Sequence, residues 1–377
     1  MSSSSLSTSR FTSLDVFRGL TVCFMIIVNT PGNGGTTFWP LSHADWNGFT
    51  PTDLVFPSFL FAVGTAISFS IKRWKNMEQT DVLMKILKRT VLIFGIGYLM
   101  YWFPFFKLDA QSHLMLSPVS QTRIMGVLQR IALCYGIVAL MVYSLGHKRT
   151  LSLCVFFLFA YWAILAIFGV PGAEYTKTGN AVLRLDTWLF GSTHLYMGEG
   201  FPFDPEGLLS TLPALFNVIA GYLVGRFIQK KGENYEVLAK LLFVGVALLF
   251  IAYCWNPLFP VNKKLWTSSY ALLTVGLDCI LLSAIIYVMD ILGKTKGSYF
   301  FLVTGRNPLF IYLMSELGAT LMLVIPIGGV SLYSWLYLNV FSYAGAYLGS
   351  FLFAIWWMLT CWMVGYFLDK KKIYIKL

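Results

Sequence analysis

The sequence predicts an all-α integral membrane protein, a polytopic membrane helix bundle of about ten transmembrane helices. Hydrophobic residues make up 57% of its 377 positions and charged residues only 12%, and the mean hydropathy is +0.69, well outside the balance of a soluble domain. Apolar runs of about 20 residues, enough to cross a bilayer core, recur along the whole chain. Only helices and closed barrels satisfy their backbone inside a bilayer, and these runs lack the alternation of barrel strands.

The expected elements follow in order from these runs. The spans cover residues 15–31, 53–71, 85–104, 124–145, 150–169, 207–229, 237–255, 266–291, 300–325 and 347–368. Pro57 and Pro308 predict breaks in the second and ninth spans, because proline removes a backbone donor. Residues 326–346 hold two adjacent glycines and several aromatics without a charge, which fits a re-entrant or interfacial segment and leaves the count open by one. We expect a disordered cytoplasmic tail at 1–12 and a single membrane domain at 13–377.

The distribution of cations predicts the orientation. Twenty of the 28 Lys and Arg residues fall on the side of the N-terminus and six on the other, so both termini are expected in the cytoplasm. The loops 30–52 and 170–206 then face outward. The net charge of +11 therefore reflects membrane orientation rather than binding of nucleic acid. All six cysteines lie in expected spans and no His/Cys metal spacing occurs, so we expect neither disulfides nor a metal.

The first outer loop holds the main candidates for chemistry. His43 is one of only four histidines, and an imidazole can take and return a proton near neutral pH. Asp53 or Asp45 can orient its ring, although a lone histidine can also be a capping or interfacial residue. Asn29 ends the first span, where its amide can cap the helix or donate to a developing oxyanion. The neighbouring candidates for substrate binding are Asp45, Trp46 and Asn47.

Polar side chains within the apolar runs form a second group. A charge at membrane depth is costly, so it normally faces the bundle interior and a partner. Arg130 can pair with Glu316 or Asp53, or hold a phosphate. Arg18, one helical turn after Asp15, is either an interfacial anchor or part of a cationic mouth for an anionic cytoplasmic ligand. The candidates for binding a cosubstrate are Arg18, Arg130, Asn307 and Glu316.

The longest outer loop, 170–206, mixes carboxylates with aromatic residues. Aromatic faces stack on sugar rings, while carboxylates accept hydrogen bonds from hydroxyl and ammonium groups. Asp204 and Glu206 are therefore candidates for substrate binding. The alternative is an interfacial aromatic belt with solvated acids.

Seven separated blocks resemble one family of membrane proteins. They are SLDVFRGL at 13–20, Asn29, HADWNGFTPTDLVFP at 43–57, GVLQR at 126–130, DPEGLLSTLPA at 204–214, VNKKLWTSSYALLT at 261–274 and NPLFIYLMSE at 307–316. In this order they resemble the transmembrane acetyltransferases typified by heparan-alpha-glucosaminide N-acetyltransferase. The animal enzymes carry an additional lumenal domain and span, so we expect the shorter bacterial type. Family members tend to have a histidine before the acid of the last block, where this chain has Ser315.

The resemblance implies transfer of an acetyl group from cytoplasmic acetyl-CoA to the amine of glucosamine or a terminal glucosaminide on the other side. The family's active-site histidine falls on His43 and its asparagine on Asn29. The nucleotide is expected near Arg18 or the cations at 72–89, with the pantetheine arm inside the bundle. The resemblance further implies a bacterial inner membrane with the His43 loop in the periplasm, and a homodimer.

Two chemical routes stay open. His43 can attack the thioester to form an acyl-imidazole, or it can act as general base in a ternary complex while Asn29 stabilises the oxyanion. We favour the general base, because an acyl-imidazole at an open outer mouth would hydrolyse. The alternative functions are an O-acyltransferase of an envelope polysaccharide and an amino-sugar permease without chemistry.

Overall fold

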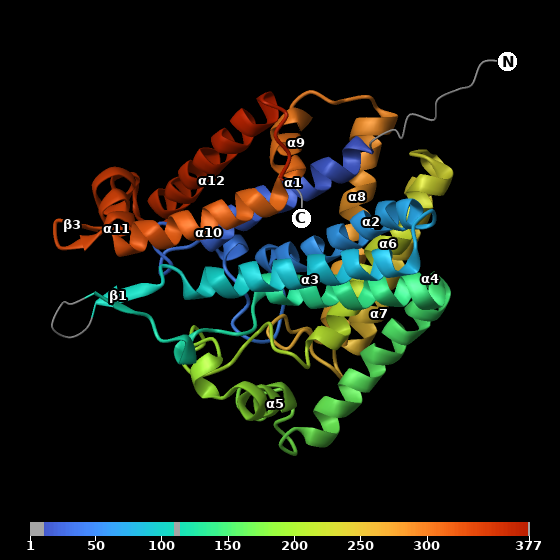
Figure 1. Ribbon diagram of the computed structural model, residues 1–377, viewed down its shortest axis with the longest axis horizontal. Helices are drawn as coiled ribbons and strands as arrows, with labels where there is room; N and C mark the ends of the chain where they lie inside the picture. Colours follow the sequence, from blue (N-terminus) through green and yellow to red (C-terminus); the bar gives the residue numbers. More distant parts are fainter. Residues whose placement is uncertain (1–10, 109–113, 376–377) are drawn as a thin grey trace.

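The computed structural model describes residues 11–108 and 114–375 and is predominantly helical (Figure 1). The tail expected at 1–12 lies for the most part outside the described residues. The helices are α1 (Thr12–Asn29), α2 (Val55–Trp74), α3 (Gln79–Trp102), α4 (Val127–Phe168), α5 (Ala181–Phe190), α6 (Thr211–Lys231), α7 (Tyr235–Trp255), α8 (Ser268–Ile286), α9 (Ser298–Arg306), α10 (Pro308–Val324), α11 (Leu332–Leu336) and α12 (Ala346–Lys370). Two short antiparallel hairpins pair β1 (Phe106–Leu108) with β2 (Leu114–Leu116), and β3 (Pro326–Ile327) with β4 (Val330–Ser331).

The apolar helices support an integral membrane protein, as expected. Within the described residues, seven helices are long and apolar enough to cross a membrane, or eight if the bent pair α9–α10 forms one span. α4 has 42 residues and is interrupted at Gly146, whose φ of 79° is not helical, and the spans expected at 124–145 and 150–169 lie on either side of this glycine. The count of ten and the orientation of the termini stay predictions.

The two prolines act differently. α9 and α10 meet at an angle of 82° immediately before Pro308, so the break expected there is present. Pro57 instead lies in the first turn of α2, where a missing N–H removes no intrahelical bond. The chain changes direction before it, in the 3-10 turn Pro51–Leu54. That turn brings Asp53 to the outer-loop end of α2.

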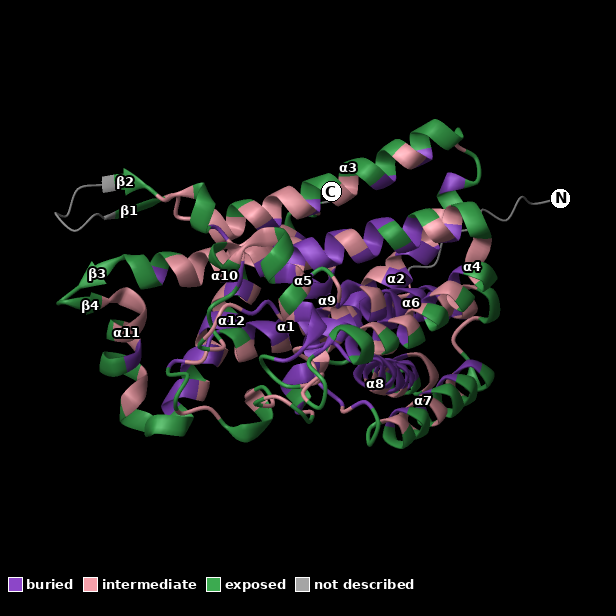
Figure 2. Ribbon diagram, turned by 90° about the horizontal axis from the view of Figure 1, so that it is seen from below, coloured by how far each residue is buried: buried purple, intermediate pink, exposed green. Residues whose placement is uncertain are grey.

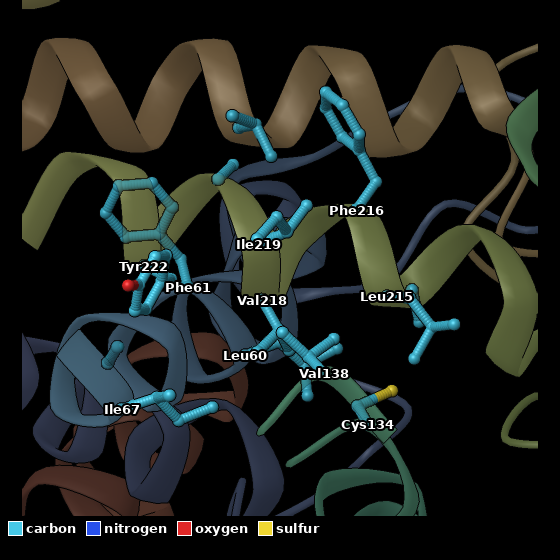
Figure 3. Packing of buried hydrophobic residues seen from close by; sticks show 14 of the residues in the cluster. Leu60, Phe61, Ile67, Cys134, Val138, Leu215, Phe216, Val218, Ile219 and Tyr222 are labelled. Atoms are coloured by element: carbon cyan, nitrogen blue, oxygen red, sulfur yellow. The ribbon is translucent and has the colours of Figure 1, made fainter. Parts of the chain in front are cut away.

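Glycines allow the central helices to approach closely. A Cβ at Gly64 of α2 would lie 1.9 Å from the carbonyl oxygen of Val218, and one at Gly221 of α6 would lie 1.9 Å from that of Phe61. The two backbones therefore touch where neither residue has a side chain. Figure 3 shows the buried apolar side chains around this contact, including Leu60 of α2 and residues of α4 and α6.

The central helices are buried, whereas the peripheral helices expose apolar side chains, as expected for a protein in a membrane. α1 contacts α2, α8, α9, α10 and α12, and Figure 2 shows α1, α2 and α8 largely buried, whereas α7 and much of α4 are exposed. The exposed side chains of α7 are large and apolar, among them Phe243 at 76% and Phe250 at 67% exposure. A water-facing helix would not present such a surface, whereas a lipid-facing one would.

Residues 326–346 form no spanning helix. They fold into the β3–β4 hairpin, the five-residue helix α11, a π-helical turn at Tyr337–Phe341 and a 3-10 turn at Ser342–Ala344. Figure 1 shows this segment at one edge of the molecule, beyond the end of α10. These short elements fit the re-entrant or interfacial segment expected from the sequence.

Candidate active site

His43 and Asp53 form a close pair at the start of α2. Nδ1 of His43 lies 2.7 Å from Oδ1 of Asp53, whose side chain is 1% exposed. The other carboxylate oxygen, Oδ2, accepts the backbone N–H of Ala44 at 3.2 Å and of Thr50 at 3.0 Å. Because a carboxylate held by two amides is an acceptor, Nδ1 of His43 carries the proton. The lone pair of Nε2 is then the one that can accept a proton.

Local sequence explains why the carboxylate lies there. Thr50 and Asp53 form a capping box with Pro51 at the first position of the turn, an arrangement that such a spacing favours. The hydroxyl of Tyr270 on α8 donates to the carbonyl oxygen of Asp53 at 2.7 Å, and the hydroxyl of Thr52 donates to that of Pro40 at 3.0 Å. The residue that orients His43 is thus also the residue that caps the helix.

Lys263 lies beside the same ring. Its Nζ is 3.1 Å from Nδ1 and 3.0 Å from Nε2 of His43, and 4.0 Å from Oδ1 of Asp53. The pKa of His43 lies below its ordinary value of 6.5, because partial burial and the charge of Lys263 outweigh the carboxylates of Asp53 and Glu206. The ring is still 42% exposed and hence accessible. Sequence reasoning treated Lys263 only as an outer cation, although it falls within the VNKKLW block.

Asn29 is paired with Glu316. Its Nδ2 donates to Oε1 of Glu316 at 3.0 Å, which joins the end of α1 to the middle of α10. The helix terminus is capped by its neighbour instead, since the hydroxyl of Thr30 donates to the carbonyl oxygen of Ile26 at 2.6 Å. Ser315 is buried and bonds back to the carbonyl oxygen of Tyr312 at 2.7 Å, so its hydroxyl serves its own helix. Glu316, predicted as a cosubstrate ligand, is thus in direct contact with Asn29, a candidate catalytic residue.

A cavity of about 140 Å³ is bordered by α1, α2, α3, α4 and α10. Arg18 of α1 and Arg89 of α3 line it together with Tyr135, and the rest of the wall is almost wholly apolar. Its lining residues are Arg18, Met25, Phe59, Ala62, Val63, Ala66, Arg89, Ile93, Val127, Leu128, Ile131, Tyr135, Pro308, Leu309 and Tyr312.

Helical spacing relates the cavity to the candidate site. Met25 lies one turn before Asn29 on α1, and Tyr312 lies one turn before Glu316 on α10. Residues four apart share a helix face, so the Asn29–Glu316 pair stands one turn beyond two walls of the cavity. Along α1, Arg18 and Asn29 are separated by about 16 Å, from the rise per residue.

Arg123 organises two carboxylates of the loop 170–206, Asp204 and Glu206. Its guanidinium donates to both oxygens of Asp204, at 2.9 and 2.7 Å, and to Glu206 at 2.5 Å. The same group packs over the rings of Tyr101 and Tyr196. Burial would raise the pKa of Glu206, but the charges of Arg123, Arg130 and Lys263 outweigh it and lower that pKa.

Asp204 and Glu206 differ in how far their carboxylate oxygens are free to bind a substrate. Both oxygens of Asp204 are occupied by Arg123, and Oδ1 also accepts the N–H of Glu206 at 2.9 Å. Glu206 is an ionised group whose charge acts on both His43 and Lys263. Arg123 was not a candidate from the sequence, where it appears only as a cation before a span.

Arg130 lies in the first turn of α4. It is fully buried, donates to the carbonyl oxygen of Gly207 at 2.8 Å and to the hydroxyl of Ser210, and stacks over Trp266. It thus holds the start of α6. Among the described contacts it pairs with neither Glu316 nor Asp53, and it does not line the cavity.

Asn307 binds the C-terminal tail. Its Nδ2 donates to the carbonyl oxygen of Ile373 at 3.0 Å, and its Oδ1 accepts the N–H of Ile375 at 2.9 Å. Arg306 beside it pairs with Asp369 at 2.7 Å. The amide of Asn307 therefore joins the α9–α10 break to the chain that follows α12. A role of Asn307 in binding the cosubstrate stays a prediction.

The loop around His43 is fixed by its neighbours. Trp46 donates to the carbonyl oxygen of Tyr175 at 2.7 Å and packs on Phe203, which ties it to the long outer loop. Asn47 accepts from the amide of Asn262 at 3.0 Å. The backbone oxygen of Asp45 accepts from Lys264 at 2.7 Å. Of these three candidates for substrate binding, Trp46 and Asn47 are engaged in holding the loop.

The fold and the site together define an integral membrane protein with a carboxylate-oriented histidine in a loop and a mostly apolar cavity between its helices. No group of three or more potential metal ligands occurs among the described residues. The chain belongs to the heparan-alpha-glucosaminide N-acetyltransferase family, because the sequence model of that family's catalytic region matches residues 10–254. The resemblance inferred from the seven blocks is thereby confirmed.

Curated relatives agree with this family. The chain is 28% identical over 366 residues to heparan-alpha-glucosaminide N-acetyltransferase of Mus musculus, covering 82% of this chain and 54% of the mouse protein. It is 28% identical over 363 residues to the protein of the same name of Homo sapiens, covering 81% of this chain and 53% of the human protein. The chain thus spans about half the length of the curated relatives it matches.

Proposed function

We propose that this protein transfers an acetyl group from cytoplasmic acetyl-CoA to the amine of glucosamine or a terminal glucosaminide on the extracytoplasmic side. The observation that carries the proposal is the cavity: two arginines line it, the rest of its wall is almost wholly apolar, and its lining residues Met25 and Tyr312 each stand one helical turn from the paired Asn29 and Glu316. The membership of the family supports an acetyltransferase. The bias of cations supports the assignment of the two sides.

The lining of the cavity matches the donor in charge and polarity. Arg18 and Arg89 would bind the anionic nucleotide portion of acetyl-CoA, since guanidinium groups match phosphate oxygens. The apolar wall formed by α1, α2, α3, α4 and α10 would cover the pantetheine arm. The thioester would then lie at the end of the cavity near Asn29.

The acceptor would enter from the outer loops. His43 carries its proton on Nδ1 and offers Nε2 as base, so an amine attacking the thioester carbonyl can give its proton to Nε2. The amide of Asn29 would stabilise the oxyanion. As the C–S bond breaks, the imidazolium returns the proton to the CoA thiolate, and the new C–N bond completes the transfer. The ionised carboxylate of Glu206 supports binding of an amino sugar.

The test is acetyl transfer by purified protein with acetyl-CoA and glucosamine, a glucosaminide or a hydroxyl-only sugar. His43→Ala is expected to abolish transfer while CoA still binds, and His194→Ala, which removes another histidine of the outer side, is the matched control. His194 contacts the carbonyl oxygen of Thr122 at 2.7 Å rather than a carboxylate. Transfer by His43→Ala near the wild-type rate would refute the role of His43.

The rival functions give different results in the same preparation. An O-acyltransferase would acetylate the hydroxyl-only sugar at least as fast as the amine. A permease would move amino sugar into proteoliposomes without acetyl-CoA, and His43→Ala would leave that transport intact. The bacterial inner membrane as location and a homodimer belong to the same proposal, and cross-linking in isolated membranes tests the dimer.

A further inference from the structure

The ammonium group of Lys263 lies over the face of the His43 ring. The two nitrogens of an imidazole point away from each other on either side of Cε1. An atom that is 3.1 Å from Nδ1 and 3.0 Å from Nε2 therefore lies above the ring rather than in its plane. Since the lone pair of Nε2 lies in the plane, Lys263 leaves it open.

The backbone on either side of Lys263 is held in place. Asn262 donates to Asn47 at 3.0 Å, and the carbonyl oxygen of Val261 accepts the N–H of Gly48 at 2.8 Å, so this loop and the His43 loop are joined directly. The carbonyl oxygen of Lys263 itself accepts the N–H of Trp266 at 2.9 Å. The Lys263 side chain is only 16% exposed.

We propose that Lys263 is a positioning residue for the acetyl transfer proposed above. Its ammonium, held over the face of His43, keeps the ring in its neutral form and leaves the in-plane lone pair of Nε2 free for the acceptor amine. The proposal rests on the proposed function only for its consequence in catalysis. The effect on the ring itself is independent of any acetyl transfer.

The balance of charges around the ring explains the effect. The charged groups acting on His43 are Lys263, Asp53 and Glu206, one cation against two carboxylates. Asp53 contacts the ring edge and stabilises an imidazolium, whereas Lys263 opposes it from the face. Without Lys263, burial would be the remaining influence that lowers the pKa of the ring, and the two carboxylates would raise that pKa, so more of the rings would be protonated and unable to accept a proton from the amine. The same repulsion would help the imidazolium to return its proton to the leaving thiolate.

A direct measurement uses the reaction of diethylpyrocarbonate with the neutral imidazole. The rate of modification of the His43 peptide is followed by mass spectrometry as a function of pH in detergent-solubilised protein. The variants are Lys263→Met, Lys263→Arg and Lys264→Met. Lys264 is the matched control, because it is a neighbouring lysine that instead donates to Glu199 at 2.6 Å and to the backbone of Asp45.

We expect Lys263→Met to raise the midpoint pH for modification of His43 by about one unit or more, from loss of a neighbouring cation. Lys263→Arg and Lys264→Met are expected to stay within about 0.3 unit of the wild type, since the charge over the ring is kept. The acid limb of the kcat profile should move in the same direction and by a similar amount. If Lys263→Met does not accumulate, Lys263→Gln serves with the same expectation.

An unchanged midpoint in the folded Lys263→Met or Lys263→Gln variant would overturn the proposal, as would an equal shift in Lys264→Met. A loss of kcat without a shifted midpoint would assign Lys263 a different role and also count against it. If wild-type protein transfers no acetyl group but the midpoints differ as expected, the proposed function fails and the effect of Lys263 on His43 stands.

Discussion

The substitution Asp53→Asn keeps His43 in place and tests whether the tautomer set by the Asp53 carboxylate matters for activity. The carboxylate is nearly unexposed and uses its two oxygens differently: Oδ1 faces Nδ1 of His43 at 2.7 Å, while Oδ2 accepts two backbone amides, from Ala44 and Thr50. An asparagine has one acceptor oxygen and one amide nitrogen of nearly the same shape. The substitution therefore changes which partners can be satisfied and changes little in packing.

The structure decides which way the new amide turns. If its nitrogen faced the amides of Ala44 and Thr50, two buried donors would lose their acceptor, at a cost of about 2–6 kcal/mol in total. If its nitrogen faces His43, every group keeps a partner, provided that Nδ1 becomes the acceptor and the ring proton moves to Nε2. The second arrangement is therefore favoured. It removes the lone pair that accepts the proton of the amine.

We expect Asp53→Asn to fold, to bind CoA and to lose about 10²- to 10⁴-fold in kcat, the range for loss of a general base. The assay is the initial rate of CoA thiol release with glucosamine as acceptor. Thr52→Val is the control, since it removes a hydroxyl bond to Pro40 in the same turn and no contact to Asp53. Activity of Asp53→Asn within about tenfold of the wild type would show that the tautomer of His43 does not matter.

Two further predictions test the cavity and the helix contact. Ala66→Phe, which places a ring in the cavity wall, should weaken CoA binding by about tenfold or more in a direct binding assay. Ala166→Phe on the exposed face of α4 should not, and equal affinities of the two variants would argue against this route for the donor. Gly64→Ala should lower the free energy of unfolding by about 1–3 kcal/mol, because its Cβ meets the carbonyl oxygen of Val218. Gly95→Ala, where a Cβ meets nothing within 4 Å, should raise that free energy by about 0.5–1 kcal/mol in thermal unfolding, and a stabilised Gly64→Ala would contradict the close packing of α2 on α6.

The local parts of the site could be foreseen because they depend on short stretches of chain. The capping box that holds Asp53 lies within four residues, and a carboxylate ten residues after His43 was a reasonable partner for it. The break at Pro308 likewise follows from one residue that cannot donate a backbone hydrogen bond. The position of Asn29 at the end of a span was also readable, but its partner was not.

The distant partners were missed because no periodic pattern specifies them. Lys263 reaches His43 across 220 positions, and Arg123 reaches Asp204 across 81. In one dimension Lys263 looks like any outer cation, and the contacts of Arg130 with Gly207 and Ser210 cannot be read from the sequence. Asn307 similarly gains its partner from the C-terminal tail.

The amino-acid sequence by itself determined that this protein lies in a membrane, that it is helical and to which family it belongs. These features follow from apolar length, backbone hydrogen bonding and short motifs, which are all properties of contiguous stretches of chain. Tertiary structure alone decided which charges meet. Helix packing through Gly64 and Gly221, and loops joined at Asn47 and Asn262, set the distances between side chains far apart in sequence. Electrostatic effects depend on those distances, so the state of His43 is a property of the folded bundle.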